Sequence, residues 1–112
     1  MHEMAITESL LEIALAEANK AGAKRITAIN LKIGALTGVV ADSISFYMEL
    51  VAKGTPAEGA RLVTTVLPVT DRCPACGADF PVEDLVFLCP TCGGPGQVVT
   101  GRELMIESLE IE

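Results

Sequence analysis

Hydrophobic and polar residues alternate along the chain with two different periods, and each period predicts a different kind of element. In residues 4–21 the apolar positions recur every three or four residues, with glutamates on the opposite face, which is typical of an amphipathic helix. Gly22 follows and is suited to end the helix, because glycine accepts a left-handed backbone. In residues 27–33 the period falls to two, which predicts a half-buried strand.

A second helix is expected after a short loop. Gly34 and Gly38 bracket the loop, and Asp42 or Ser43 is positioned to cap the helix by accepting a hydrogen bond from its first turn. Gly54 marks the end of this helix. Its apolar residues share one face at helical spacing and are predicted to point to the core: Ile44, Tyr47, Met48 and Val51.

Two further strands are predicted on either side of a segment rich in cysteine, proline and glycine, residues 70–98. Residues 62–69 are β-branched, and the chain is strand-like again in residues 101–112. Because these two strands flank the cysteine-rich segment, we expect them to pair antiparallel, with that segment projecting from their tip. A bulge near Glu107 and Ser108 would bring the apolar residues of the last strand to one face: Leu104, Ile106, Leu109 and Ile111.

The four cysteines stand in two identical frames, one from Cys73 to Cys76 and one from Cys89 to Cys92, each with proline second and glycine after the last cysteine. Two residues between cysteines let both sulfurs of one turn reach a single ion, and four thiolates in a tetrahedron suit Zn²⁺. Disulfides or free thiols are the alternative, and a chain without features of secretion favours the metal. The same four ligands also fit iron.

The order of the elements predicts an α+β fold in two parts. Residues 1–69 and 99–112 are expected to form a small three-stranded sheet with two helices on one face. Residues 70–98 are expected to form an inserted zinc-ribbon module. This module is too short to bury much apolar area, so the metal should supply most of its stability.

Charge and composition exclude several classes of function. The formal net charge of the 112-residue chain is −7, and zinc-bound thiolates would add to it, so the protein should repel phosphate backbones. This argues against nucleic-acid binding and favours a partner protein or a cationic ligand. The chain opens with no basic and apolar leader, and no apolar run reaches about 18 residues, so we expect a cytoplasmic protein without a membrane role.

The only histidine, His2, stands beside the amino group of Met1. The Met1 amine, the His2 backbone nitrogen and the His2 ring nitrogen can close fused chelate rings around one ion, with the Glu3 backbone nitrogen as a fourth ligand. Four nitrogens in a plane suit Ni²⁺ or Cu²⁺ and do not suit tetrahedral Zn²⁺. Glu3 could instead bind through its carboxylate, and we favour the backbone. A solvated surface histidine is the alternative interpretation of His2.

Together these features resemble the HypA family of nickel-metallochaperones, which help to assemble [NiFe]-hydrogenase. The resemblance covers the whole chain and is carried by the paired cysteine frames and three further segments: Met1-His2-Glu3-Met4, Glu8-Ser9-Leu10-Leu11-Glu12-Ile13 and Gly101-Arg102-Glu103-Leu104. It implies that His2, Glu3 and the Met1 amine bind nickel as cargo. It also implies structural zinc on four ligands: Cys73, Cys76, Cys89 and Cys92. The implied partners are a nickel-maturation GTPase, the hydrogenase large subunit and, for some relatives, urease maturation proteins.

Catalysis is not expected, because with His2 committed to metal there is no second histidine to activate a serine or threonine. Two other functions stay open on the cysteines alone. A rubredoxin-like iron electron carrier would leave the long segment before Cys73 without a role. A zinc-ribbon adaptor for nucleic acid or the transcription machinery conflicts with the acidic charge.

Overall fold

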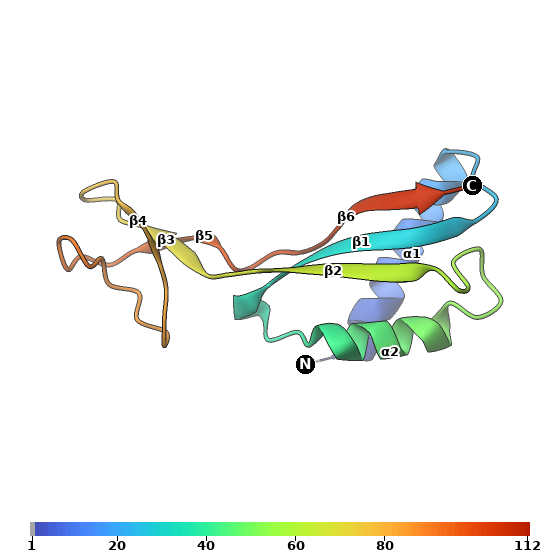
Figure 1. The fold of residues 1–112 in the computed structure, drawn as a ribbon, viewed down its shortest axis with the longest axis horizontal. Helices are drawn as coiled ribbons and strands as arrows, with labels where there is room; N and C mark the ends of the chain where they lie inside the picture. The colour runs from blue at the N-terminus through green and yellow to red at the C-terminus, as the bar shows by residue number, and fades with distance from the viewer. Residues whose placement is uncertain (1) are drawn as a thin grey trace.

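The computed structural model describes residues 2–112 as two small three-stranded sheets that follow one another along an elongated molecule of 54 × 26 × 17 Å (Figure 1). The first sheet has the order β2-β1-β6, from β1 (Ile26–Gly34), β2 (Arg61–Leu67) and β6 (Leu104–Ile111), beside helices α1 (Glu3–Lys20) and α2 (Ala41–Val51). The second has the order β4-β3-β5, from β3 (Thr70–Arg72), β4 (Asp79–Pro81) and β5 (Gln97–Thr100). The predicted α+β fold with an inserted cysteine-rich module is confirmed.

The predicted cap of α2 is wrong. Val40 occupies the N-cap position and makes no side-chain capping bond. Its carbonyl oxygen accepts hydrogen bonds from the N–H groups of Ser43 (3.1 Å) and Ile44 (3.2 Å), so the helix starts ahead of Asp42. Asp42 lies in the first turn instead, where its negative charge interacts favourably with the positive end of the helix.

The predicted pairing of the two strands that flank the cysteine-rich segment is also wrong. β1 lies between them, parallel to β2 and antiparallel to β6. α2 connects β1 to β2, and a strand–helix–strand connection places its two strands parallel. The residues Ile29 and Leu31 of β1 are 1 % exposed and pack in one cluster with both helices, which makes β1 the central strand.

The predicted bulge in β6 is confirmed. Asn30 pairs with Ser108, and the next residue, Leu31, pairs with Ile106, so Glu107 is the extra residue. With a strict period of two, Ile106 and Leu109 would point to opposite faces of the sheet. The bulge brings both to the face that packs against the core.

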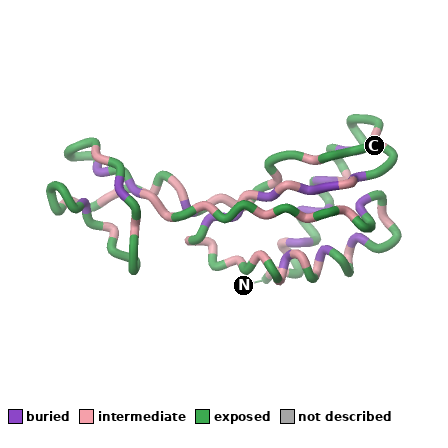
Figure 2. The backbone as a smooth tube through the Cα atoms, in the orientation of Figure 1, coloured by how far each residue is buried: buried purple, intermediate pink, exposed green. Residues whose placement is uncertain are grey.

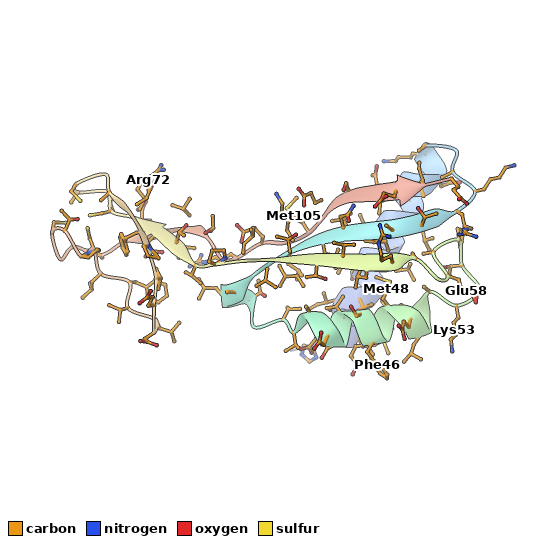
Figure 3. All side chains as sticks on the ribbon, viewed as in Figure 1. Phe46, Met48, Lys53, Glu58, Arg72 and Met105 are labelled. Carbon is orange, nitrogen blue, oxygen red and sulfur yellow. The ribbon has the colours of Figure 1, made fainter. Side chains whose placement is uncertain are left out.

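The main hydrophobic core lies between the first sheet and the two helices, where the buried residues gather in Figure 2. Figure 3 shows Met48 between α2 and the sheet, whereas Phe46 points away from the sheet and is 59 % exposed. The core consists mainly of aliphatic side chains: Leu10, Leu11, Ala14, Ala18, Ile26, Ile29, Leu31, Ile44, Met48, Ala52 and Ala57. Among the described residues, no helix is long and apolar enough to cross a membrane.

Between the two sheets, the backbone at Gly34 lies in close contact with the backbone at Gly101. A Cβ atom on Gly34 would lie 2.1 Å from the carbonyl carbon of Gly101, so only glycine allows this approach. The N–H of Gly34 donates to the carbonyl oxygen of Glu103, and the N–H of Leu36, in the 3-10 turn Ala35–Thr37, donates to that of Gly101, both at 2.7 Å. These bonds tie the end of β1 to the segment that returns from the second sheet.

Candidate metal centres

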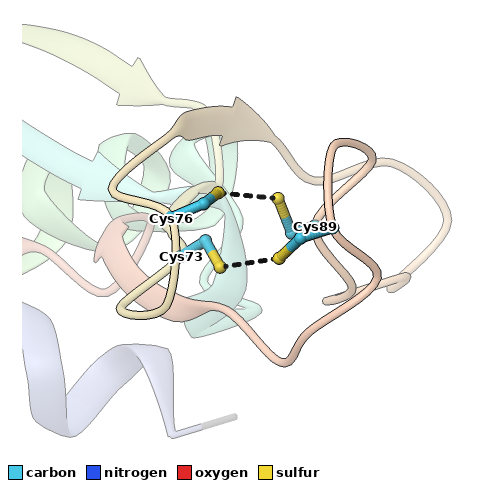
Figure 4. Close-up of side chains that lie close together, drawn as sticks. Cys73, Cys76 and Cys89 are labelled. Carbon is cyan, nitrogen blue, oxygen red and sulfur yellow. Dashed lines mark hydrogen bonds between the residues drawn. The ribbon is translucent and has the colours of Figure 1, made fainter.

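The four cysteines converge at the second sheet, although they come from two turns far apart in the chain. Their sulfur atoms all lie within 4.8 Å of one another. Two contacts join the turns, marked by dashed lines in Figure 4: Cys73 Sγ lies 3.4 Å from Cys92 Sγ, and Cys76 Sγ lies 3.6 Å from Cys89 Sγ. Cys73 and Cys89 are buried, whereas Cys76 and Cys92 are exposed.

Each pair of cysteines is held by a tight turn that ends in glycine. The N–H of Gly77 donates to the Cys73 carbonyl oxygen at 2.7 Å, and the N–H of Gly93 donates to that of Cys89 at 2.8 Å. Both glycines have a left-handed backbone, with φ of 76° and 75°. A residue with a Cβ atom is strained there, which explains why each frame ends in glycine.

Backbone N–H groups point toward the sulfurs and change their acidity. The N–H of Cys92 lowers the pKa of Cys89 to about 6, and the N–H of Cys76 lowers the pKa of Cys73. The pKa of Cys76 is raised to about 11, because the N–H of Ala78, which acts to lower it, is outweighed by the neighbouring Cys89 and Cys73 thiols. Cys76 and Cys89 lie in contact, and a metal ion would bind both as thiolates.

The arrangement fits zinc. A tetrahedral ion with Zn–S bonds of about 2.3 Å requires sulfurs about 3.8 Å apart, which the observed spacings bracket. Four sulfur ligands also leave no open position on a tetrahedral ion, which is characteristic of a structural site and not of a catalytic one. The N–H groups of Cys76 and Cys92 donate to the sulfurs of Cys73 and Cys89, which stabilises these sulfurs as thiolates.

Next to this cluster lies a buried carboxylate that the sequence analysis did not single out. Asp71 is 0 % exposed, and neither of its carboxylate oxygens has a hydrogen-bond partner among the described residues. A Cβ atom on Gly96 would lie 2.5 Å from Asp71 Oδ2 and 2.6 Å from Phe80 Cζ, so glycine makes the room for both side chains. No pattern marked Asp71, because an aspartate before a cysteine frame usually belongs to a solvated turn.

The second candidate centre lies at the start of α1. His2 is exposed and occupies the N-cap position, and its side chain makes no capping bond. The His2 carbonyl oxygen accepts a hydrogen bond from the Ile6 N–H at 3.0 Å, and the buried Thr7 hydroxyl donates to the Glu3 carbonyl oxygen at 2.6 Å. These two hydrogen bonds hold the first turn of α1, which begins immediately after His2. The predicted Met1 ligand lies outside the described residues.

The chain matches relatives over its whole length. It is 45 % identical to the hydrogenase maturation factor HypA of Geobacter metallireducens, with 100 % of both chains covered. It is 44 % identical to the protein of the same name from Chloroflexus aggregans, with 98 % of both covered. Its fold is similar to the solution structure of the nickel metallochaperone HypA from Helicobacter pylori, with a TM-score of 0.72 at 23 % identity over 99 % of this chain and 97 % of that one.

The family model that describes hydrogenase/urease nickel incorporation and metallochaperones matches residues 1–111. Nickel is the cargo of this family and zinc its structural metal, and the four clustered cysteines fit the zinc. These matches extend across both sheets and are not confined to the cysteine frames. The chain therefore belongs to the HypA family of nickel-incorporation metallochaperones for hydrogenase and urease.

Proposed function

We propose that this protein binds Ni(II) at its N-terminus and delivers it during the maturation of [NiFe]-hydrogenase, while a Zn(Cys)₄ site stabilises the ribbon. The observation that carries the proposal is the exposed His2 at the start of α1, in a chain whose family incorporates nickel. The His2 side chain makes no capping bond to the helix, so nickel would replace no capping contact. The protein acts as a carrier and not as an enzyme.

The ligands of nickel are the Met1 amine, the backbone nitrogens of His2 and Glu3, and the His2 ring nitrogen. Both amides lose a proton when the ion binds. The positive end of α1 favours this loss, because it stabilises the negative nitrogens that result.

A site of this kind suits delivery. It is built on the first residues of the chain, ahead of the strands of both sheets, so an acceptor can take the ion by supplying competing ligands. The acceptors and partners follow from the family: a nickel-maturation GTPase, the hydrogenase large subunit and, for related systems, urease maturation proteins. The protein works in the cytoplasm, where thiols stay reduced and can hold zinc.

The two metals belong to two domains. Residues 1–69 and 99–112 form the nickel-binding domain, and residues 70–98 form the zinc-ribbon domain, with Cys73, Cys76, Cys89 and Cys92 as zinc ligands. Two separate clusters of buried residues support this division, one around Ile29 and one of Cys73, Phe80 and Cys89. When bound, zinc links the two cysteine turns and supplies no reactive position.

The N-terminus itself provides the sharpest test. Nickel titrations would compare the native chain with one extended ahead of Met1 and one extended after Glu112, using extensions that contain no histidine. The extension ahead of Met1 moves the amine out of chelating reach and is expected to weaken nickel binding at least about 10- to 100-fold, which is the loss caused by removing a group that only supports a ligand. The extension after Glu112 leaves all four nitrogens in place and serves as the matched control.

Acetylation of the Met1 amine should act like the first extension, because an amide has lost the lone pair and the charge of the amine. Equal nickel affinity in all forms would reject the amine and backbone nitrogens as ligands. If the native chain bound no nickel at all, the proposed delivery function would be rejected with them.

A further inference from the structure

The tip of the zinc ribbon, residues 83–88, presents large apolar side chains to solvent. Leu85 is 71 % exposed, Val86 is 55 % exposed and Leu88 is 56 % exposed. Beside them is a recess of about 390 Å³ with apolar walls and an acidic rim, lined by Phe80, Pro81, Glu83, Asp84, Val86, Leu88 and Pro90. Exposed apolar side chains gathered in this way on a small domain are typical of a protein contact surface.

The backbone of the tip is held in an uncommon conformation. Asp84 and Leu85 are both left-handed, with φ of 51° and 59°, and leucine rarely adopts this conformation. The segment is fixed at both ends, because the Val86 N–H donates to the Glu83 carbonyl oxygen and the Gly96 N–H donates to the Phe87 carbonyl oxygen. A strained leucine that is 71 % exposed contributes little to packing, so its conformation points to a role other than stability.

The charge of the ribbon indicates what the tip recognises. Within residues 70–98 the only basic residue is Arg72, and its guanidinium already pairs with Asp79 at 2.7 Å. Glu83 and Asp84 make no ion pair with any described residue. The recess therefore offers two carboxylates above an apolar wall, which matches the aliphatic stem and cationic head of a lysine or arginine.

We propose that the ribbon tip docks onto a partner protein of the maturation machinery through a basic side chain flanked by apolar residues. The basic side chain enters the recess, and Leu85 and Val86 cover the apolar residues around it. The identity of the partner rests on the proposed function. The chemistry of recognition is inferred from the apolar and acidic side chains of the tip. Zinc takes part indirectly, because it fixes the turns on which residues 83–88 are mounted.

Purified nickel-maturation GTPase and purified hydrogenase large-subunit precursor serve as the two probes, each titrated with the zinc-loaded full chain. Val86→Thr and Asp84→Asn alter the tip, and both new residues suit the local backbone. The matched controls are Val66→Thr, at a valine of β2 that is 57 % exposed, and Asp42→Asn in α2. Zinc content, thermal unfolding and nickel binding are measured on every variant.

We expect each tip variant to weaken binding of at least one probe at least about fivefold, which is the loss that marks an energetically important interface residue. The controls should bind like the native chain. Asp84→Asn should also reduce the dependence of affinity on salt, because it removes one charge from the contact. Leu85→Gly relieves the strained backbone and should lower affinity without lowering the thermal stability of the ribbon.

Equal affinities of tip variants and controls would overturn the docking proposal, and so would a native chain that binds neither probe. A dimer of this chain that the tip variants abolish would assign the tip to a second copy and would overturn it as well. These results leave nickel binding at the N-terminus untouched. Failure of the proposed function appears separately, as a native chain that takes up no nickel.

Discussion

The two sheets of this protein are equal in strand number but differ in what holds them together. The first packs against two helices over a continuous aliphatic core. In the second, the buried cluster consists of Cys73, Cys89 and Phe80, so two of its three members belong to the cysteine cluster that fits zinc. A hydrophobic core persists when any one contact is removed, whereas a metal site depends on all of its ligands at once. Loss of the metal should therefore disrupt the second sheet and spare the first, and a cavity in the aliphatic core should do the reverse.

Loss of a zinc ligand should have the largest effect, confined to the ribbon. Cys89→Ala leaves three thiolates around the ion, and the short ribbon has little apolar area to compensate. We expect the bound zinc to be lost and residues 70–98 to become sensitive to protease, while the helices keep their circular dichroism. Removing zinc from the native chain with a chelator should reproduce this pattern. Full zinc content and full protease resistance in Cys89→Ala would contradict a structural role for the metal.

A cavity in the main core should have the next largest effect, in the other region. Ile29→Ala removes most of a side chain that is 1 % exposed, and such changes cost about 2–5 kcal/mol of unfolding free energy. The same substitution at Ile13, which is 53 % exposed on α1, is the matched control and should change stability little. Urea denaturation measures both. Zinc affinity of the folded Ile29→Ala protein should equal that of the native chain, and a large drop would show that the two regions are not separate.

Sequence and structure agree best where the signal is local. Short stretches of sequence suffice to predict four features, because each depends mainly on residues close together in the chain. They are the helix predicted in residues 4–21, the strand predicted in residues 27–33, the glycines that end each cysteine turn and the bulge at Glu107. The strand order was wrong, because the position of β1 between its neighbours depends on how both helices pack on it. Asp71 was missed for the same reason: only the folded ribbon shows that its carboxylate is buried.

Replacement of Asp71 should change zinc binding less than loss of a cysteine does, and in the opposite direction. Its carboxylate is buried without a hydrogen-bond partner among the described residues and stands two residues from Cys73, so its charge opposes the thiolates around the metal. Asp71→Asn keeps the shape and removes the charge, and we expect zinc affinity to rise about tenfold, which corresponds to about 1.4 kcal/mol. Competition with a chromophoric chelator measures this. Asp79→Asn, at an exposed aspartate of the same sheet, is the control, and weaker zinc binding by Asp71→Asn would show that the carboxylate supports the site.

The smallest effect on folding is expected at His2, the proposed nickel ligand. His2 is exposed and its ring makes no capping bond, so His2→Ala should change the free energy of unfolding by no more than about 0.5 kcal/mol and leave zinc bound. Nickel affinity should nevertheless fall sharply, because the ring nitrogen is lost. Glu3→Gln separates the two possible roles of the neighbouring residue, since it keeps the backbone nitrogen and changes only the carboxylate. Nickel titration and thermal unfolding of both variants distinguish the two roles of Glu3. Unchanged nickel binding in Glu3→Gln supports the backbone nitrogen as the ligand. A loss of nickel affinity as large as that of His2→Ala assigns the carboxylate instead.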